Sequence, residues 1–106
     1  MGKLTTHVLD TVSGKPGAGV LVKLMRQGEE IARGVTNAEG RLDGPLVEDG
    51  EGEYDLVFEV GDYFYGQGYA EGIFKSAVIR FEMRKGGKYH VPLVCTPWAY
   101  STYRGS

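Results

Sequence analysis

Two histidines and one arginine are the residues of this chain best suited to acid–base chemistry. His7 and His90 are the only histidines among its 106 residues. An imidazole titrates near neutral pH, so it can accept a proton from water. Arg41 carries a permanent charge on a planar guanidinium, whose forked donors suit carbonyl and anionic oxygens. Together these side chains have the means to activate a water and to hold a developing oxyanion.

Local sequence leaves simpler interpretations of these residues open. His7 and His90 lie in segments of alternating pattern, each pointing opposite to apolar neighbours such as Val8 and Val91. Both could therefore be surface imidazoles without a role. Arg41 could be an ordinary charged residue at the start of a strand.

The C-terminal segment, residues 95–106, is unusual for the end of a chain. It is dense in aromatic and hydroxyl side chains, including Ser101, Tyr103 and Ser106, and it carries Arg104 close to the carboxyl terminus. We expect this tail to dock on the rest of the molecule; a frayed end is the alternative.

The elements that must position these residues are short strands. Residues 4–11 alternate, with Leu4, Thr6 and Val8 on one face and Thr5, His7 and Leu9 on the other. Similar patterns predict strands at residues 20–25, 31–35, 54–60, 77–83, 89–94 and 99–103, separated by turn residues, with a very short strand at Arg41. Pro92 within one of these strands predicts an unpaired rung.

Seven or eight short strands predict an all-β fold, an antiparallel Greek-key β-sandwich. We expect residues 1–106 to form a single domain, because this length suffices for one two-layer core. Two glycines in residues 62–69 argue for a loop there on propensity alone.

Composition limits the partners. Basic and acidic residues number 12 and 14 and are spread along the chain, so no basic stripe for nucleic acid is expected. No apolar run approaches the roughly 18 residues that a membrane span needs. A lone cysteine and an N-terminus without an apolar leader favour the cytoplasm.

Metal and thiol chemistry are not expected. His7, His90 and Cys95 are too few to build a closed zinc site within one chain. Cys95 is expected to face inward as a small apolar residue. The acidic residues 48–53 lack the ligand spacing of a calcium loop and predict a surface loop. We expect no metal and no cofactor.

Three motifs give the chain a resemblance to a known family. They are Leu4-Thr5-Thr6-His7-Val8-Leu9-Asp10-Thr11 with Gly14-Lys15-Pro16, then Thr36-Asn37-Ala38-Glu39-Gly40-Arg41, and finally Tyr89-His90-Val91-Pro92-Leu93 with the closing Tyr103-Arg104-Gly105-Ser106. In this order they resemble the transthyretin-like proteins, and the closing tetrapeptide resembles that of their enzyme branch, the 5-hydroxyisourate hydrolases.

The resemblance implies the same sandwich fold, with one short helix in residues 62–69 and Asp62 as its N-cap. It also implies a homotetramer in which two dimers meet face to face. The channel between them would be lined by the strands that carry His7, His90, Ser101 and Tyr103.

The resemblance further implies a reaction: hydrolysis of 5-hydroxyisourate to 2-oxo-4-hydroxy-4-carboxy-5-ureidoimidazoline in urate degradation. The implied catalytic residues are His7, Arg41, His90, Tyr103 and Ser106. Those implied to contact substrate are His7, Arg41, Ser101, Tyr103 and Arg104. Which histidine is the base stays open, because that depends on tautomer and geometry.

Two other functions stay open as alternatives. The first is a non-catalytic transthyretin-like carrier that holds an aromatic ligand in the same channel; retention of both histidines and Arg41 argues against it. The second is a monomeric β-sandwich adhesion or sugar-binding module with an exposed aromatic platform.

Overall fold

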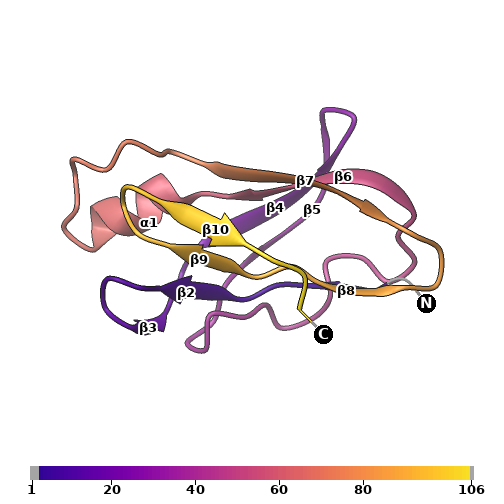
Figure 1. The fold of residues 1–106 in the computed structure, drawn as a ribbon, viewed down its shortest axis with the longest axis horizontal. Coiled ribbons are helices and arrows are strands. Elements are labelled where there is room, and N and C mark those ends of the chain that lie inside the picture. Colours follow the sequence, from indigo (N-terminus) through magenta and orange to yellow (C-terminus); the bar gives the residue numbers. More distant parts are fainter. Residues whose placement is uncertain (1–2, 106) are drawn as a thin grey trace.

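The computed structural model describes residues 3–105 and consists of strands with one short helix (Figure 1). In chain order the elements are β1 (Lys3–Thr5), β2 (Val8–Asp10), β3 (Lys15–Pro16), β4 (Leu21–Arg26), β5 (Glu29–Val35), β6 (Gly52–Phe58), α1 (Val60–Gly66), β7 (Ala77–Met83), β8 (Lys88–His90), β9 (Leu93–Cys95) and β10 (Tyr100–Thr102).

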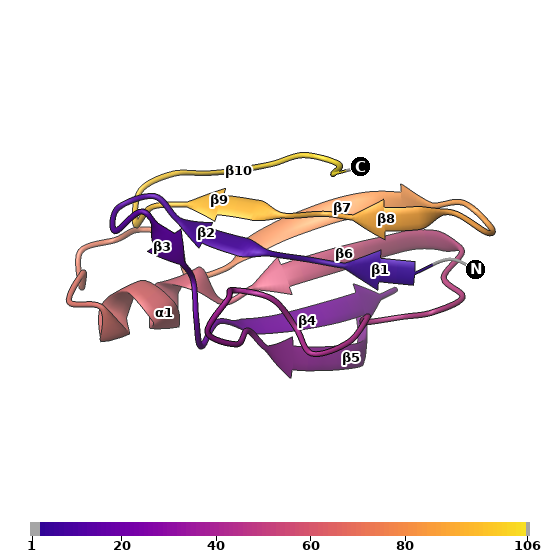
Figure 2. The same cartoon turned by 90° about the horizontal axis from the view of Figure 1, so that it is seen from below.

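The strands form two layers, which confirms the predicted β-sandwich. One layer has the order β10-β9-β2-β3, and the pair β1-β8 extends it, because β1 runs on into β2 and β8 into β9. The other layer has the order β5-β4-β6-β7. Figure 2 shows β10, β9 and β2 on one side of the molecule and β4 and β5 on the other.

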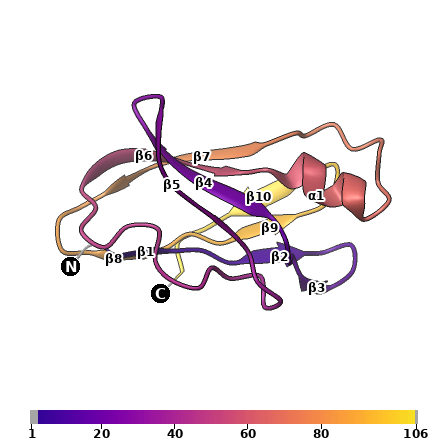
Figure 3. The same cartoon turned by 180° about the vertical axis from the view of Figure 1, so that it is seen from behind.

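Pairing departs from the expected purely antiparallel pattern in one layer. β1 pairs with β8 and β2 with β9 in parallel, whereas the other named strands pair antiparallel. The parallel pairs bring the first segment of the chain alongside the segment that carries His90. Figure 3 shows β1 and β8 side by side near one end of the molecule, with α1 at the other.

The core lies between the layers and follows the predicted alternation. Leu4 and Val8 are fully buried, and Thr6 between them is 2% exposed. Val22, Leu24, Leu56, Phe58 and Leu93 are also fully buried. Each such side chain stabilises the fold by roughly 1.5–3 kcal/mol. The odd-numbered Thr5, His7 and Leu9 are left on the outer face, as predicted.

Two of the predicted strands are interrupted where their functional residues lie. The 4–11 segment breaks at Thr6–His7, and the 89–94 segment breaks at Val91–Pro92. The two segments stay joined across the break, since the Val91 N–H donates to the Thr5 carbonyl and the Leu93 N–H to the His7 carbonyl. Pro92 has no N–H to donate, and it lies between these two bonds on the edge that faces β10. On that side the Thr102 hydroxyl donates to the Pro92 carbonyl.

The helix α1 overrides local propensity. Its Val60 and Phe64, four residues apart, are both buried, so tertiary packing of one face outweighs the glycine content. Val60 was expected to end the preceding strand and instead begins the helix. The expected Asp62 cap is wrong, because Glu59 holds the N-cap position and Asp62 lies in the first turn. Within residues 3–105 no helix is long and apolar enough to cross a membrane.

Candidate active site

His7 lies in the gap between β1 and β2, where its backbone pairs with Arg41 in an isolated antiparallel bridge. Its ring Nε2 lies 2.9 Å from the Glu39 carbonyl oxygen. A carbonyl only accepts, so Nε2 carries the proton, and in the neutral ring Nδ1 bears the free lone pair. The half-buried ring thus has one fixed tautomer and one available acceptor.

Arg41 reaches this position through a tight turn. The Asn37 side-chain oxygen accepts hydrogen bonds from the backbone N–H groups of Glu39 and Arg41. Gly40 adopts φ 76°, and a Cβ there would lie 2.5 Å from the Val8 carbonyl oxygen. Only glycine allows this approach. The predicted short strand is reduced to one bridged residue with an exposed guanidinium.

His90 ends β8 and lies opposite Thr5 in the parallel register. The Thr5 hydroxyl is 2.9 Å from His90 Nδ1, which leaves Nε2 of His90 without a protein partner within residues 3–105. Because residues two apart on a strand share a face, Thr5 places the rings of His90 and His7 on the same outer surface of the sheet.

Electrostatics tie the three groups together. Burial first, and then the positive charges of Arg41 and His7, hold the pKa of His90 below its usual 6.5. His90 is therefore neutral at physiological pH and can accept a proton. The structure thus brings His7, Arg41 and His90 into one neighbourhood, although they lie far apart in sequence.

The C-terminal tail docks on the same region, which rules out the frayed-end interpretation for residues 100–105. The Gly105 N–H donates to the His90 carbonyl at 2.7 Å. A Cβ at Gly105 would lie 2.6 Å from His90 Cδ2, so the tail packs closely against the imidazole. Arg104 donates to the Lys88 carbonyl and stacks on the Tyr89 ring at 4.3 Å.

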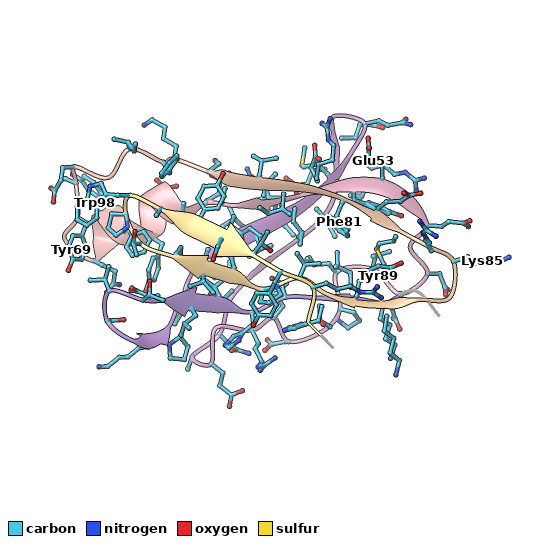
Figure 4. All side chains as sticks on the ribbon, in the orientation of Figure 1. Glu53, Tyr69, Phe81, Lys85, Tyr89 and Trp98 are labelled. Carbon is cyan, nitrogen blue, oxygen red and sulfur yellow. The ribbon has the colours of Figure 1, made fainter. Side chains whose placement is uncertain are left out.

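The remaining predicted residues lie at differing distances from this cluster. Ser101 is opposite Val94, which is opposite Leu9, so the register places it on the outer face that carries His7. Tyr103 is 60% exposed and lines an apolar recess with Phe81 and Tyr89, rather than the recess beside His90. Phe81 and Tyr89 are labelled in Figure 4. Ser106 lies outside the described residues.

A recess of about 230 Å³ opens beside His90. Its lining residues are Lys3, Thr5, Lys88, Tyr89, His90 and Gly105. Sequence reasoning did not assign Lys3, Thr5 or Lys88 to the site. Local alternation carried part of the signal, because residues 3, 5 and 7 share one face and Lys88 lies two residues before His90. That the first three lie beside His90 follows only from the β1-β8 register.

The buried environment of Cys95 disfavours thiol chemistry. Cys95 is 1% exposed, as predicted, and burial, with the nearby Asp10, raises its pKa to about 12. A thiol so protonated is a poor nucleophile. Among residues 3–105, no three His, Cys, Asp or Glu side chains gather as a possible metal site.

The fold and this cluster define a small β-sandwich with a histidine- and arginine-bearing outer sheet face. Residues 4–105 match the model of the HIUase/Transthyretin family. A 5-hydroxyisourate hydrolase of Deinococcus radiodurans is 51% identical, with 97% of this chain and 95% of that protein covered. The chain belongs to the HIUase/Transthyretin family.

Solved structures agree on the architecture. The 5-hydroxyisourate hydrolase of Klebsiella pneumoniae has a TM-score of 0.88 and 41% identity, covering 98% of this chain and 99% of that one. Sea bream transthyretin in complex with thyroxine has a TM-score of 0.86 but only 27% identity, covering 97% and 94%. The chain is thus more similar in sequence to the hydrolase than to the thyroxine-bound protein.

Proposed function

We propose that this protein hydrolyses 5-hydroxyisourate to 2-oxo-4-hydroxy-4-carboxy-5-ureidoimidazoline in urate degradation. The observation that carries the proposal is the convergence of His7, Arg41 and His90 on one sheet face in a chain so similar to named 5-hydroxyisourate hydrolases. No cofactor is needed, because the reaction is the hydrolysis of a cyclic amide.

The chemistry follows from the side chains. His7 orients and activates the water through Nδ1, the nitrogen its tautomer leaves free. The water oxygen bonds to the ring carbonyl carbon as a histidine takes the proton, and Arg41 holds the developing oxyanion. The ring C–N bond then breaks and the leaving nitrogen takes up a proton. His90, neutral and oriented by Thr5, serves in proton transfer.

The closing residues complete the site in this proposal. Tyr103 and Ser106 close the pocket, and Ser101 and Arg104 contact substrate. The docking of Gly105 on His90 supports a role for the tail. Tyr103 projects from the single chain, which suits a group that acts across a boundary between subunits.

We propose a homotetramer, with sites at the interface between two dimers. The outer face that carries His7 also bears the half-buried apolar Leu9 and Val94, and covering it would exclude water from the site. We also propose that residues 1–106 form one domain. A cytoplasmic, reducing location fits the free thiol of Cys95.

The decisive experiment generates 5-hydroxyisourate in situ from urate and follows the decay of its ultraviolet absorbance. With protein present, the decay should accelerate in proportion to protein concentration. A carrier would instead bind an aromatic ligand such as thyroxine without altering the decay, and that result would replace the hydrolase with the alternative.

A further inference from the structure

The recess beside His90 contains an arrangement of charges that the hydrolytic residues do not explain. Lys3 and Lys88 are directly opposite each other in the parallel pair β1-β8. Like charges directly opposite each other on neighbouring strands repel. Both lysines line the recess.

The strand geometry places both lysine side chains on the sheet face that carries His90. Lys3 precedes Thr5 by two residues, and Lys88 precedes His90 by two, so all four side chains share one face. The hydrogen bond between Thr5 and His90 fixes which face this is. The spacing along each strand is about 6–7 Å, within the reach of a lysine side chain.

The basic residues at this recess have no salt-bridge partner within residues 3–105. Salt bridges join Lys23 to Glu59, Arg33 to Glu30 and Arg80 to Asp55. Within residues 3–105, neither Lys3 nor Lys88 forms one, and nor do the neighbouring Arg41 and Arg104. The chain has a net charge of −2, so composition does not force basic residues to go unpaired.

Arg104 adds a third, immobilised charge. Its guanidinium donates to the Lys88 carbonyl while stacking on Tyr89, another wall of the recess. The recess is smaller than the ~300–1,000 Å³ of drug-sized sites, which suits one oxygen-bearing group of a small ligand.

We infer that Lys3 and Lys88 form an anion subsite that attracts an oxoanionic heterocycle to His90 and holds the carboxylate formed when its ring amide opens. This rests on the proposed function. Hydrolysis supplies the charge: water oxygen bonds to the carbonyl carbon, the C–N bond breaks, nitrogen takes a proton, and the resulting carboxylic acid ionises. Positive charge at the subsite therefore favours both capture and ring opening.

The test is the ionic-strength dependence of the hydrolysis rate in a Lys3→Met/Lys88→Met variant of the full chain. At low salt, kcat/KM should fall about tenfold through slower capture, and its decrease with added salt should be shallower than in the unmodified protein. A Lys3→Arg/Lys88→Arg variant, which keeps the charge, should retain the original salt dependence.

A Lys15→Met/Lys75→Met variant is the matched control, because it removes the same net charge from exposed positions outside the recess. It should change kcat/KM less than twofold. If the Lys3/Lys88 variant keeps the original salt dependence and rate, or if the control falls equally, the subsite is wrong while hydrolysis stands. Failure of the unmodified protein to accelerate the decay would instead overturn the proposed function itself.

Discussion

The outer faces of the two sheets differ in how the charged residues described on them are paired. On the β5-β4-β6-β7 sheet, Arg80 forms a two-pronged hydrogen-bonded ion pair with Asp55 across β6 and β7. Arg33 does the same with Glu30. The face formed by β1, β8, β2, β9 and β10 instead carries His7 and His90 near cations that have no acidic partner within residues 3–105.

This contrast distinguishes charged groups that are paired with each other from charged groups that are available to bind a ligand. The ion pairs hold the pKa of Asp55 and of Glu30 below the usual range, mainly through the hydrogen bonds from Arg80 and Arg33. Such exposed pairs contribute little to stability, but each places a negative charge next to a positive one. On the histidine face, burial first and then positive charge lower the pKa of His90, and the same positive charge favours a bound oxyanion.

Substitution of the two histidines should have the largest effect on activity and tests directly whether the histidine face is the active one. His7→Asn and His90→Asn should each reduce turnover by about 10²–10⁴-fold, because each deletes a proton-transfer group while keeping polarity. Turnover is measured by the decay of 5-hydroxyisourate, and folding by circular dichroism. Asp55→Asn, on the opposite face, is the control and should leave turnover unchanged. Full activity in both histidine variants would refute the site.

Truncation after Thr102 should have the next largest effect. It removes Gly105 from the His90 carbonyl and Arg104 from Tyr89, so we expect activity to fall at least 100-fold. The melting temperature should change little, because none of Tyr103, Arg104 and Gly105 contributes a side chain to the core. A truncated protein with unchanged turnover would show that the tail is dispensable.

Thr5 tests a smaller, indirect contribution. Thr5→Val keeps the shape but loses the hydroxyl on His90 Nδ1, and should lower kcat about tenfold, the equivalent of one hydrogen bond. Thr5→Ser should restore most of the rate. A merely structural role predicts equal rates for both variants, or a loss of activity that tracks a loss of melting temperature.

Local pattern was sufficient to predict the strands and their buried faces. The alternation of residues 4–9 and 54–58 is strict, and the structure buries the predicted side of each. Local pattern failed at α1, where packing of Val60 and Phe64 outweighs two glycines. The strand breaks lie at the isolated His7–Arg41 bridge and at Pro92, which lacks the N–H of a continuous ladder.

The candidate site was predictable only in part. The tetrapeptide and the two histidines stood out as residue types, and the family motifs placed Arg41 beside them. Lys3 and Thr5 did not stand out, because their proximity to His90 depends on a parallel pairing between segments 85 residues apart. Register between distant strands is set by the whole fold, and no periodicity within either strand encodes it.

The subtlest test compares the charge environment of His90 with that of a compensated face. Arg41→Gln removes a cation that now disfavours the imidazolium, so the pKa of His90 should rise toward 6.5. Burial acts in the same direction as Arg41 and persists, so the rise should be incomplete. The measurement is a nuclear magnetic resonance titration of the His90 imidazole, whose signal is assigned as the one that persists in His7→Asn.

The lowered pKa of His90 also makes stability depend on pH. Because the pKa of His90 is lower in the folded state, the unfolded chain binds more protons as pH falls below 6.5, and wild-type stability should decline there more than that of His90→Asn. Arg80→Gln is the control for Arg41→Gln and should leave the pKa of His90 unchanged, because Arg80 is already paired with Asp55. An equal shift in both arginine variants would mean that His90 senses the net charge of the protein rather than a neighbourhood left uncompensated for a ligand.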